Sequence, residues 1–150
     1  MNIKRGGTGL LLTELLIAVM FFSLASAICL RLFVAAHQSS ERSAELSRAV
    51  IEAQNMAETF KAANGNIGRT AELLGIEPSY INSSGHLYLT FDANWDRDAN
   101  SSDYAAILYP SGYTATSSYA TVTVYKSTIV DGLQTDEELF SVDIAAVKAD

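Results

Sequence analysis

The sequence predicts an α+β protein in which one long amino-terminal helix packs against a four-stranded antiparallel sheet. Three observations support this fold class. An unbroken apolar run over residues 10–30 continues into a striped helical segment that ends near residue 64. Four segments with strand-like alternation follow after residue 85, separated by turn-forming residues. A chain of 150 residues has room for one folded domain in addition to such a helix.

The apolar run from Leu10 to Leu30 is long enough to cross a membrane. Its roughly 20 residues, at about 1.5 Å each, match the ~30 Å thickness of the hydrocarbon core. Lys4 and Arg5 precede the run, so the positive-inside rule places the amino terminus in the cytoplasm and residues from about 37 onward outside. The lone cysteine, Cys29, lies within the run, so core packing rather than disulfides must stabilise the exported part.

The second half of the helix is predicted from residues 46–60, where apolar side chains recur at intervals of three and four. The predicted buried stripe consists of Leu46, Val50, Ala53, Ala57 and Phe60. Charged residues occupy the remaining faces of this segment. The pair at 64–65, Asn-Gly, should end the helix because both residues tolerate the left-handed conformation that follows a helix carboxyl terminus.

Residues 65–85 predict a loop with one short helix, residues 70–74, which Gly75 closes. The four expected strands are His86–Asp92, Tyr104–Tyr109, Tyr119–Ser127 and Glu138–Val147. The second strand should stop at the turn-forming residues 110–112, which are Pro-Ser-Gly. The polar residues from 131 to 136 should connect the last two strands.

One carboxylate interrupts the apolar run. Glu14 lies four residues into it, and no other acid or base occurs before Arg31. An acidic side chain in hydrocarbon is costly, so it predicts a functional site that includes a cationic partner. Arg31 ends the run, where its long side chain can reach the membrane interface.

The residues around Glu14 resemble the type IV prepilin signal, which bacterial pilins share with the pseudopilins of type II secretion and DNA-uptake systems. In that family a basic leader ends in Gly, the next residue is apolar, and Glu is the fifth residue of the mature chain. Gly9, Leu10 and Glu14 match these positions, and Thr13-Glu14-Leu15-Leu16 resembles the usual core of the signal. Mature pilins often begin with Phe, and Leu10 departs from that pattern. The resemblance covers residues 4 to about 60, and beyond them it concerns architecture only.

This resemblance implies three segments: a leader peptide (residues 1–9), the transmembrane half of the helix (10–36) and an extracytoplasmic pilin-like domain (37–150). It implies that a prepilin peptidase cuts between Gly9 and Leu10 and methylates the new amino group of Leu10. The other implied partners are pilin or pseudopilin subunits and an inner-membrane assembly platform. Glu14 would pair with the amino terminus of an adjacent subunit. The helical segment around residues 46–60 resembles that of minor subunits.

Other interpretations of the apolar run stay open. Ala25-Ser26-Ala27 fits the small-x-small rule of ordinary signal peptidase, although apolar residues continue past that cut and Glu14 would lie inside the signal. An uncleaved single-span anchor that carries an extracellular binding or sensor domain leaves Glu14 without a partner. A lipid-modified Cys29 would need a small residue where Ile28 stands. Neighbouring genes for an assembly ATPase, a platform protein and a prepilin peptidase would discriminate between these classes.

Asp96, Asp98 and Asn100 alternate as the oxygen ligands of a calcium loop do. Ser101 and Ile107 stand where the EF-hand pattern has its Gly and its bidentate Glu. A solvated acidic turn without a metal explains the same residues. The sequence therefore leaves a calcium site and an acidic turn as alternatives.

Nothing in the sequence predicts an enzyme or a cofactor. His37 and His86 lack partners at metal-ligand spacing, and the serines lack a matching base or nucleophile elbow. The net charge of −7 argues against a general nucleic-acid interface, although it leaves room for a small basic patch.

Overall fold

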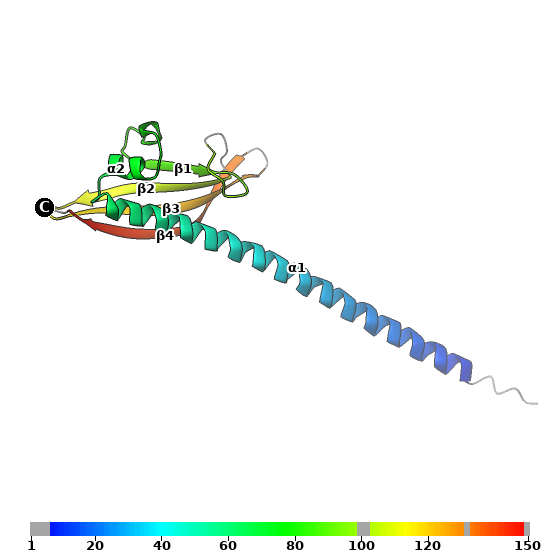
Figure 1. Cartoon of the computed structure of the whole chain (residues 1–150). Coiled ribbons are helices and arrows are strands. Elements are labelled where there is room, and N and C mark those ends of the chain that lie inside the picture. Colours follow the sequence, from blue (N-terminus) through cyan, green and yellow to red (C-terminus); the bar gives the residue numbers. More distant parts are fainter. Residues whose placement is uncertain (1–6, 99–102, 131–132, 149–150) are drawn as a thin grey trace, which may run out of the picture. The chain divides into compact units, whose positions relative to one another are not determined.

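The computed structural model describes residues 7–98, 103–130 and 133–148 (Figure 1). The chain forms two compact units, Met1–Ser43 and Ala44–Asp150. Helix α1, Gly7–Ala62, contributes to both units. The first unit contains the amino-terminal part of α1. The second contains the rest of α1, a short helix α2 (Ile67–Leu73), a 3₁₀ turn (Pro78–Tyr80) and four strands.

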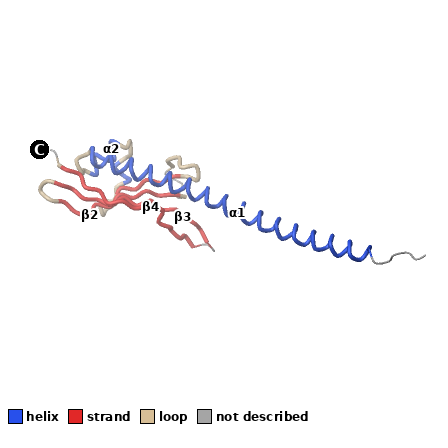
Figure 2. The backbone as a smooth tube through the Cα atoms, turned by 90° about the horizontal axis from the view of Figure 1, so that it is seen from below, coloured by secondary structure: helices blue, strands red, loops and turns tan. Residues whose placement is uncertain are grey.

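The four strands form one antiparallel sheet in the order β1-β2-β3-β4, so each strand pairs with its neighbour in sequence. Their bounds are Leu87–Phe91 for β1, Tyr104–Tyr113 for β2, Ser117–Val130 for β3 and Leu133–Val147 for β4. The carboxyl-terminal turns of α1 lie along one face of this sheet (Figures 1 and 2). The predicted fold class, a long apolar amino-terminal helix packed against a four-stranded antiparallel sheet, is confirmed.

Helix α1 ends where the sequence predicts. Asn64 and Gly65 have positive φ angles of 54° and 75°. The amide of Gly65 donates to the carbonyl of Phe60 at 2.9 Å, and that of Asn64 donates to Lys61 at 3.0 Å. These are the two hydrogen bonds of a Schellman cap, which satisfies carbonyls that the helix itself leaves unpaired.

The core lies between α1 and the inner face of the sheet. The helix contributes small residues and two large ones, and the strands contribute most of the large side chains. The fully buried members are Ala49, Ala53, Met56, Phe60, Leu87, Phe91, Ala106, Leu108, Ala120, Val122, Val124 and Ala146. Ala49, Ala53 and Ala57 share one helical face, and their small side chains let the helix backbone approach the sheet closely, so the large strand side chains fill the remaining space.

The predicted helical stripe is partly wrong. Ala53, Ala57 and Phe60 are buried, but Leu46 is 37% exposed and Val50 is only half-buried. Ala49 and Met56 take their places. A stripe chosen by hydrophobicity favours large residues, whereas close packing against a sheet of large side chains selects small ones.

Several boundaries also differ from the sequence-based expectation. Strand β2 continues past Pro110, because a register shift between Pro110 and Gly112 accommodates a residue that has no amide hydrogen. Strand β4 begins at Leu133, so polar residues 134–136, which were expected to belong to a connection, are paired instead, as Thr135 is with Thr128. Helix α2 spans Ile67–Leu73 rather than residues 70–74, and β3 spans Ser117–Val130 rather than Tyr119–Ser127.

Candidate functional site

The segment around the predicted cleavage site forms the first turns of α1. Thr13 donates its hydroxyl hydrogen to the carbonyl of Gly9 at 2.8 Å, an ordinary i to i−4 contact within a helix. A methyl group added at Gly9 would meet nothing within 4 Å, so the fold itself does not demand glycine there. Leu10 is 73% exposed. A requirement for Gly9 would therefore have to come from a partner protein.

Glu14 lies on the same helical face as Leu10, Thr13 and Ile17, and these four residues line a shallow hollow of about 470 Å³. Their spacing of three, four and seven residues places them on one side of the helix. The carboxylate has no cation within 4 Å among the described residues. Glu14 is thus an acid surrounded by exposed apolar side chains, with no partner in the described part of its own chain.

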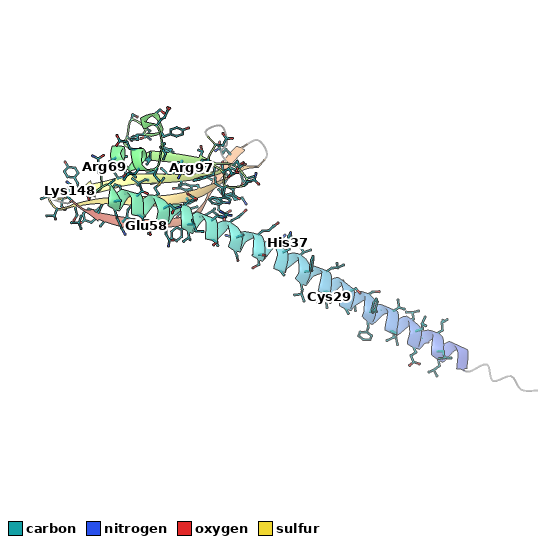
Figure 3. The ribbon with its side chains drawn as sticks, in the orientation of Figure 1. Cys29, His37, Glu58, Arg69, Arg97 and Lys148 are labelled. Atoms are coloured by element: carbon teal, nitrogen blue, oxygen red, sulfur yellow. The ribbon has the colours of Figure 1, made fainter. Side chains whose placement is uncertain are left out.

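The apolar side chains of the first unit are unburied throughout. Residues 9–43 are all exposed, including Leu15, Phe22 and Phe33 at 66%, 75% and 74%. Within the described residues, α1 is long and apolar enough to cross a membrane by its length and composition. The helix continues without a break through Ala25–Ala27 and Cys29, whose side chain projects outward from α1 (Figure 3).

A second cluster, which the sequence did not reveal, links α1 to the sheet. The Lys126 Nζ lies 2.6 Å from Oε1 of Glu45, and the Tyr104 hydroxyl donates to the same oxygen at 3.0 Å. The Glu45 and Lys126 side chains are 25% and 33% exposed. The hydrogen bond to Glu45 raises the pKa of Lys126, and burial, followed by the bond to Glu45, raises the pKa of Tyr104. No local signal could pair Glu45 with a lysine 81 residues away.

Trp95 covers this cluster. Its ring stacks on that of Tyr104, with centroids 4.1 Å apart and planes 19° from parallel. Trp95 also has a positive φ of 67°, which is uncommon for a bulky residue and costs about 1–2 kcal/mol. The turn that begins at Asp92 holds this conformation, because the Trp95 amide donates to the Asp92 carbonyl at 3.0 Å.

In the acidic loop, residues 92–98, the carboxylate of Asp92 accepts hydrogen bonds from backbone amides of the same loop. Oδ1 of Asp92 accepts hydrogen bonds from the amides of Asn94 and Asp96, both at 2.9 Å. The bond from Asp96 is the main reason that the pKa of Asp92 lies below its usual value. Asp98 is tied to β1 by its backbone, because its carbonyl accepts from the Thr90 hydroxyl at 2.6 Å. These contacts are those of a self-capped turn.

The calcium hypothesis gains no support from these contacts. Asn100, one of its three predicted ligands, lies outside the described residues. Within the described ranges, no three His, Cys, Asp or Glu side chains are arranged to hold a metal ion.

The two histidines make ordinary contacts. His37 lies 3.2 Å from Glu41 on the exposed surface of α1. His86 packs edge-to-face against Tyr109 on the outer sheet face, with ring centroids 4.9 Å apart. Burial, followed by a hydrogen bond with Tyr125, raises the pKa of Tyr109.

Comparison of the chain with models of known protein families, with curated proteins and with solved structures finds no match. The prepilin signal therefore remains a resemblance, carried by Gly9, Leu10 and Glu14. The structure itself provides the fold class and one helix that is long and apolar enough for a membrane.

Proposed function

We propose that this protein is a minor pilin or pseudopilin, a structural subunit of a filament that assembles through its amino-terminal helix. The observation that carries the proposal is Glu14, the only charged side chain between Arg5 and Arg31, exposed on an apolar helix. The fold is compatible with this function, because a long helix packed against an antiparallel sheet is the pilin architecture.

The proposed processing step supplies the missing cation. A prepilin peptidase cuts the peptide bond between Gly9 and Leu10 on the cytoplasmic side, and the product is a free α-amino group on Leu10. That amine, which the same enzyme methylates, remains a cation at neutral pH. It lies four residues before Glu14, on the same helical face. Because the helix terminus is only two residues before Gly9, the peptidase needs to unwind little structure to reach the bond.

The proposed assembly step joins two subunits. Glu14 pairs with the amino terminus of an adjacent subunit when the assembly platform draws the helices into a bundle. Water is scarce there, so an unpaired carboxylate is costly and a paired one is strongly attracted to its partner. Subunits with the correct stagger satisfy both charges, whereas displaced subunits leave one charge unpaired. The pair thereby selects the register of the helices.

The decisive experiment is Glu14→Val in the native host. Removal of the charge should leave membrane insertion unharmed, because an acid in the span costs a few kcal/mol. Amino-terminal sequencing should give Leu10 for both wild type and variant. The variant should accumulate in the membrane fraction and disappear from the sheared-filament fraction, because it lacks the partner for its neighbour's amine.

Glu41→Val is the matched control, since Glu41 lies on the same helix but beyond the apolar run. It should reach the filament like wild type. Equal incorporation of wild type and Glu14→Val would refute the role of Glu14. A mature terminus at Ile28 would instead favour ordinary signal peptidase, and an intact Met1 would favour the membrane-anchored binding or sensor domain.

A further inference from the structure

A cavity opens at the end of the folded unit where α1 stops. Its volume is about 530 Å³, and it lies between the carboxyl-terminal turn of α1, the start of α2 and the β2–β3 hairpin. Arg69 and Lys148 line it, and both lie at this end of the unit (Figure 3). Tyr113 and Tyr119 line it as well and are 83% and 42% exposed. We call this feature the distal pocket.

The distal pocket is cationic. Its described lining contains Arg69 and Lys148 and no Asp or Glu. Lys148 lies 5.4 Å from the centroid of the Tyr113 ring and donates to the carbonyl of Thr114 at 3.2 Å. Neither cation has a described carboxylate within 4 Å. Exposed tyrosines beside an arginine are typical of the residues that carry most of the energy in protein interfaces.

The charge of the surrounding unit restricts the ligand. Residues 44–150 contain six Lys or Arg and fifteen Asp or Glu, a net charge of −9. Nucleic acids and anionic membranes present dense negative charge, which this unit repels. A protein surface with two or three carboxylates has a much lower charge density than a nucleic acid or an anionic membrane, and salt screening over about 8 Å limits the repulsion from the rest of its own unit. The chemistry therefore favours an acidic segment of a protein.

The chain carries such a segment at the other end of its own sheet. Residues 136–138, Asp-Glu-Glu, are all exposed on β4. They pair with Tyr125–Ser127 of β3, whereas the distal pocket adjoins Ser118. Eight residues of strand separate the two places, or roughly 25 Å at 3.3 Å per residue. The acidic segment therefore cannot reach the distal pocket of its own chain.

We propose that the distal pocket binds the 136–138 segment of a second copy of this chain. Arg69 and Lys148 meet the carboxylates of Asp136 and Glu138, and Tyr113 packs against the incoming strand. Each copy uses one end as donor and the other as acceptor, so the contact is heterologous and does not close as a two-fold dimer. This inference rests on the proposed filament function, to which it adds a contact between folded units.

The test uses full-length chains that carry Cys29→Ser and are co-expressed with two different tags. One copy carries Gly112→Cys and the other Thr135→Cys, which leave the cations and carboxylates of the contact in place, and a short bis-maleimide links nearby thiols. The matched control replaces Thr135→Cys with Glu58→Cys, at an exposed residue of α1 that does not line the pocket. Mixed-tag products should exceed the control several-fold, and Arg69→Glu should reduce them to the control level.

The mixed-tag cross-linked products are measured in both the sheared-filament and the membrane fraction. Each measurement is made with chains that retain Glu14 and with chains that carry Glu14→Val. Mixed-tag products at the control level in both fractions, or linkage of Gly112→Cys only to a different protein, would overturn the contact even where filaments form. Normal incorporation of Glu14→Val with cross-linking retained would refute the role of Glu14 and leave the contact standing.

A charge exchange separates binding from folding. Arg69→Glu with Lys148→Glu should deplete the filament fraction, and addition of Asp136→Lys and Glu138→Lys to the same chain should restore it. A folding defect would not be rescued in this way, so failure of the restoration also counts against the contact.

Discussion

Replacement of Glu45 with Gln should lower the free energy of unfolding of the folded unit by about 1–2 kcal/mol. A hydrogen bond to a charged group contributes about 1.5–3 kcal/mol when buried, and an exposed ion pair contributes about 0–1 kcal/mol. The contribution of the Glu45–Lys126 pair should lie between these limits, because the two side chains are 25% and 33% exposed and their charged atoms are 2.6 Å apart. Glutamine preserves the shape and an acceptor for Tyr104, so the variant removes mainly the charge.

The assay is thermal and urea unfolding of the fragment that begins at residue 37. For about 110 residues, the unfolding entropy near the midpoint is roughly 0.23 kcal/mol/K, so 1–2 kcal/mol corresponds to a Tm lower by about 4–9 °C. Glu58→Gln is the control, because Glu58 is exposed on the same helix and has no cation within 4 Å among the described residues. It should change the unfolding free energy by less than about 0.5 kcal/mol.

The pH dependence provides an independent check. Glu45 raises the pKa of Lys126 in the folded state above its usual 10.5, so the stabilisation is fully present below that pH. It is lost as the pH rises through the raised pKa. The raised pKa of Tyr104 acts in the same direction. Wild type and Glu45→Gln should therefore differ at pH 7 and converge as the pH rises through the raised pKa of Lys126. If Glu45→Gln matches Glu58→Gln at pH 7, Glu45 does not hold α1 to the sheet.

Three further predictions concern the turns. Gly75→Ala should lower the free energy of unfolding by about 1 kcal/mol, because alanine disfavours the positive φ at that position. Gly65→Ala should lower it by about 3 kcal/mol, because its Cβ would also lie 2.3 Å from the Ser118 Cβ. Equal losses of unfolding free energy in urea would contradict the close approach at Gly65. Asp92 has a lowered folded pKa, so its contribution is present above the usual 3.8 and is lost as the pH falls through the lowered value. The Tm of wild type should therefore drop more between pH 7 and pH 3 than that of Asp92→Asn, and parallel curves would refute the turn assignment. Calcium and a chelator should give the same Tm for the fragment that begins at residue 37, and a rise with calcium would restore the metal hypothesis.

The features that the sequence predicts correctly are those with local signals. The length of an apolar run is enough to predict a membrane-spanning helix. The end of a helix can be predicted at Asn64-Gly65 because both residues tolerate the left-handed conformation. The strand segments were found because side chains alternate along them, as Leu87, Leu89 and Phe91 do on the buried face of β1. The charge at Glu14 stands out because no other residue between Arg5 and Arg31 is charged.

The features that the sequence could not supply depend on residues far apart in the chain. The buried helical face was misplaced because Ala49 is buried only through the sheet above it, and alanine alone carries little signal. Strand β2 continues past Pro110 because β3 provides a partner with a shifted register. The pairing of Glu45 with Lys126 and the meeting of Arg69 with Lys148 at the distal pocket require the whole sheet to be assembled first. Periodicity reports which residues share a face, but long-range packing determines what that face meets.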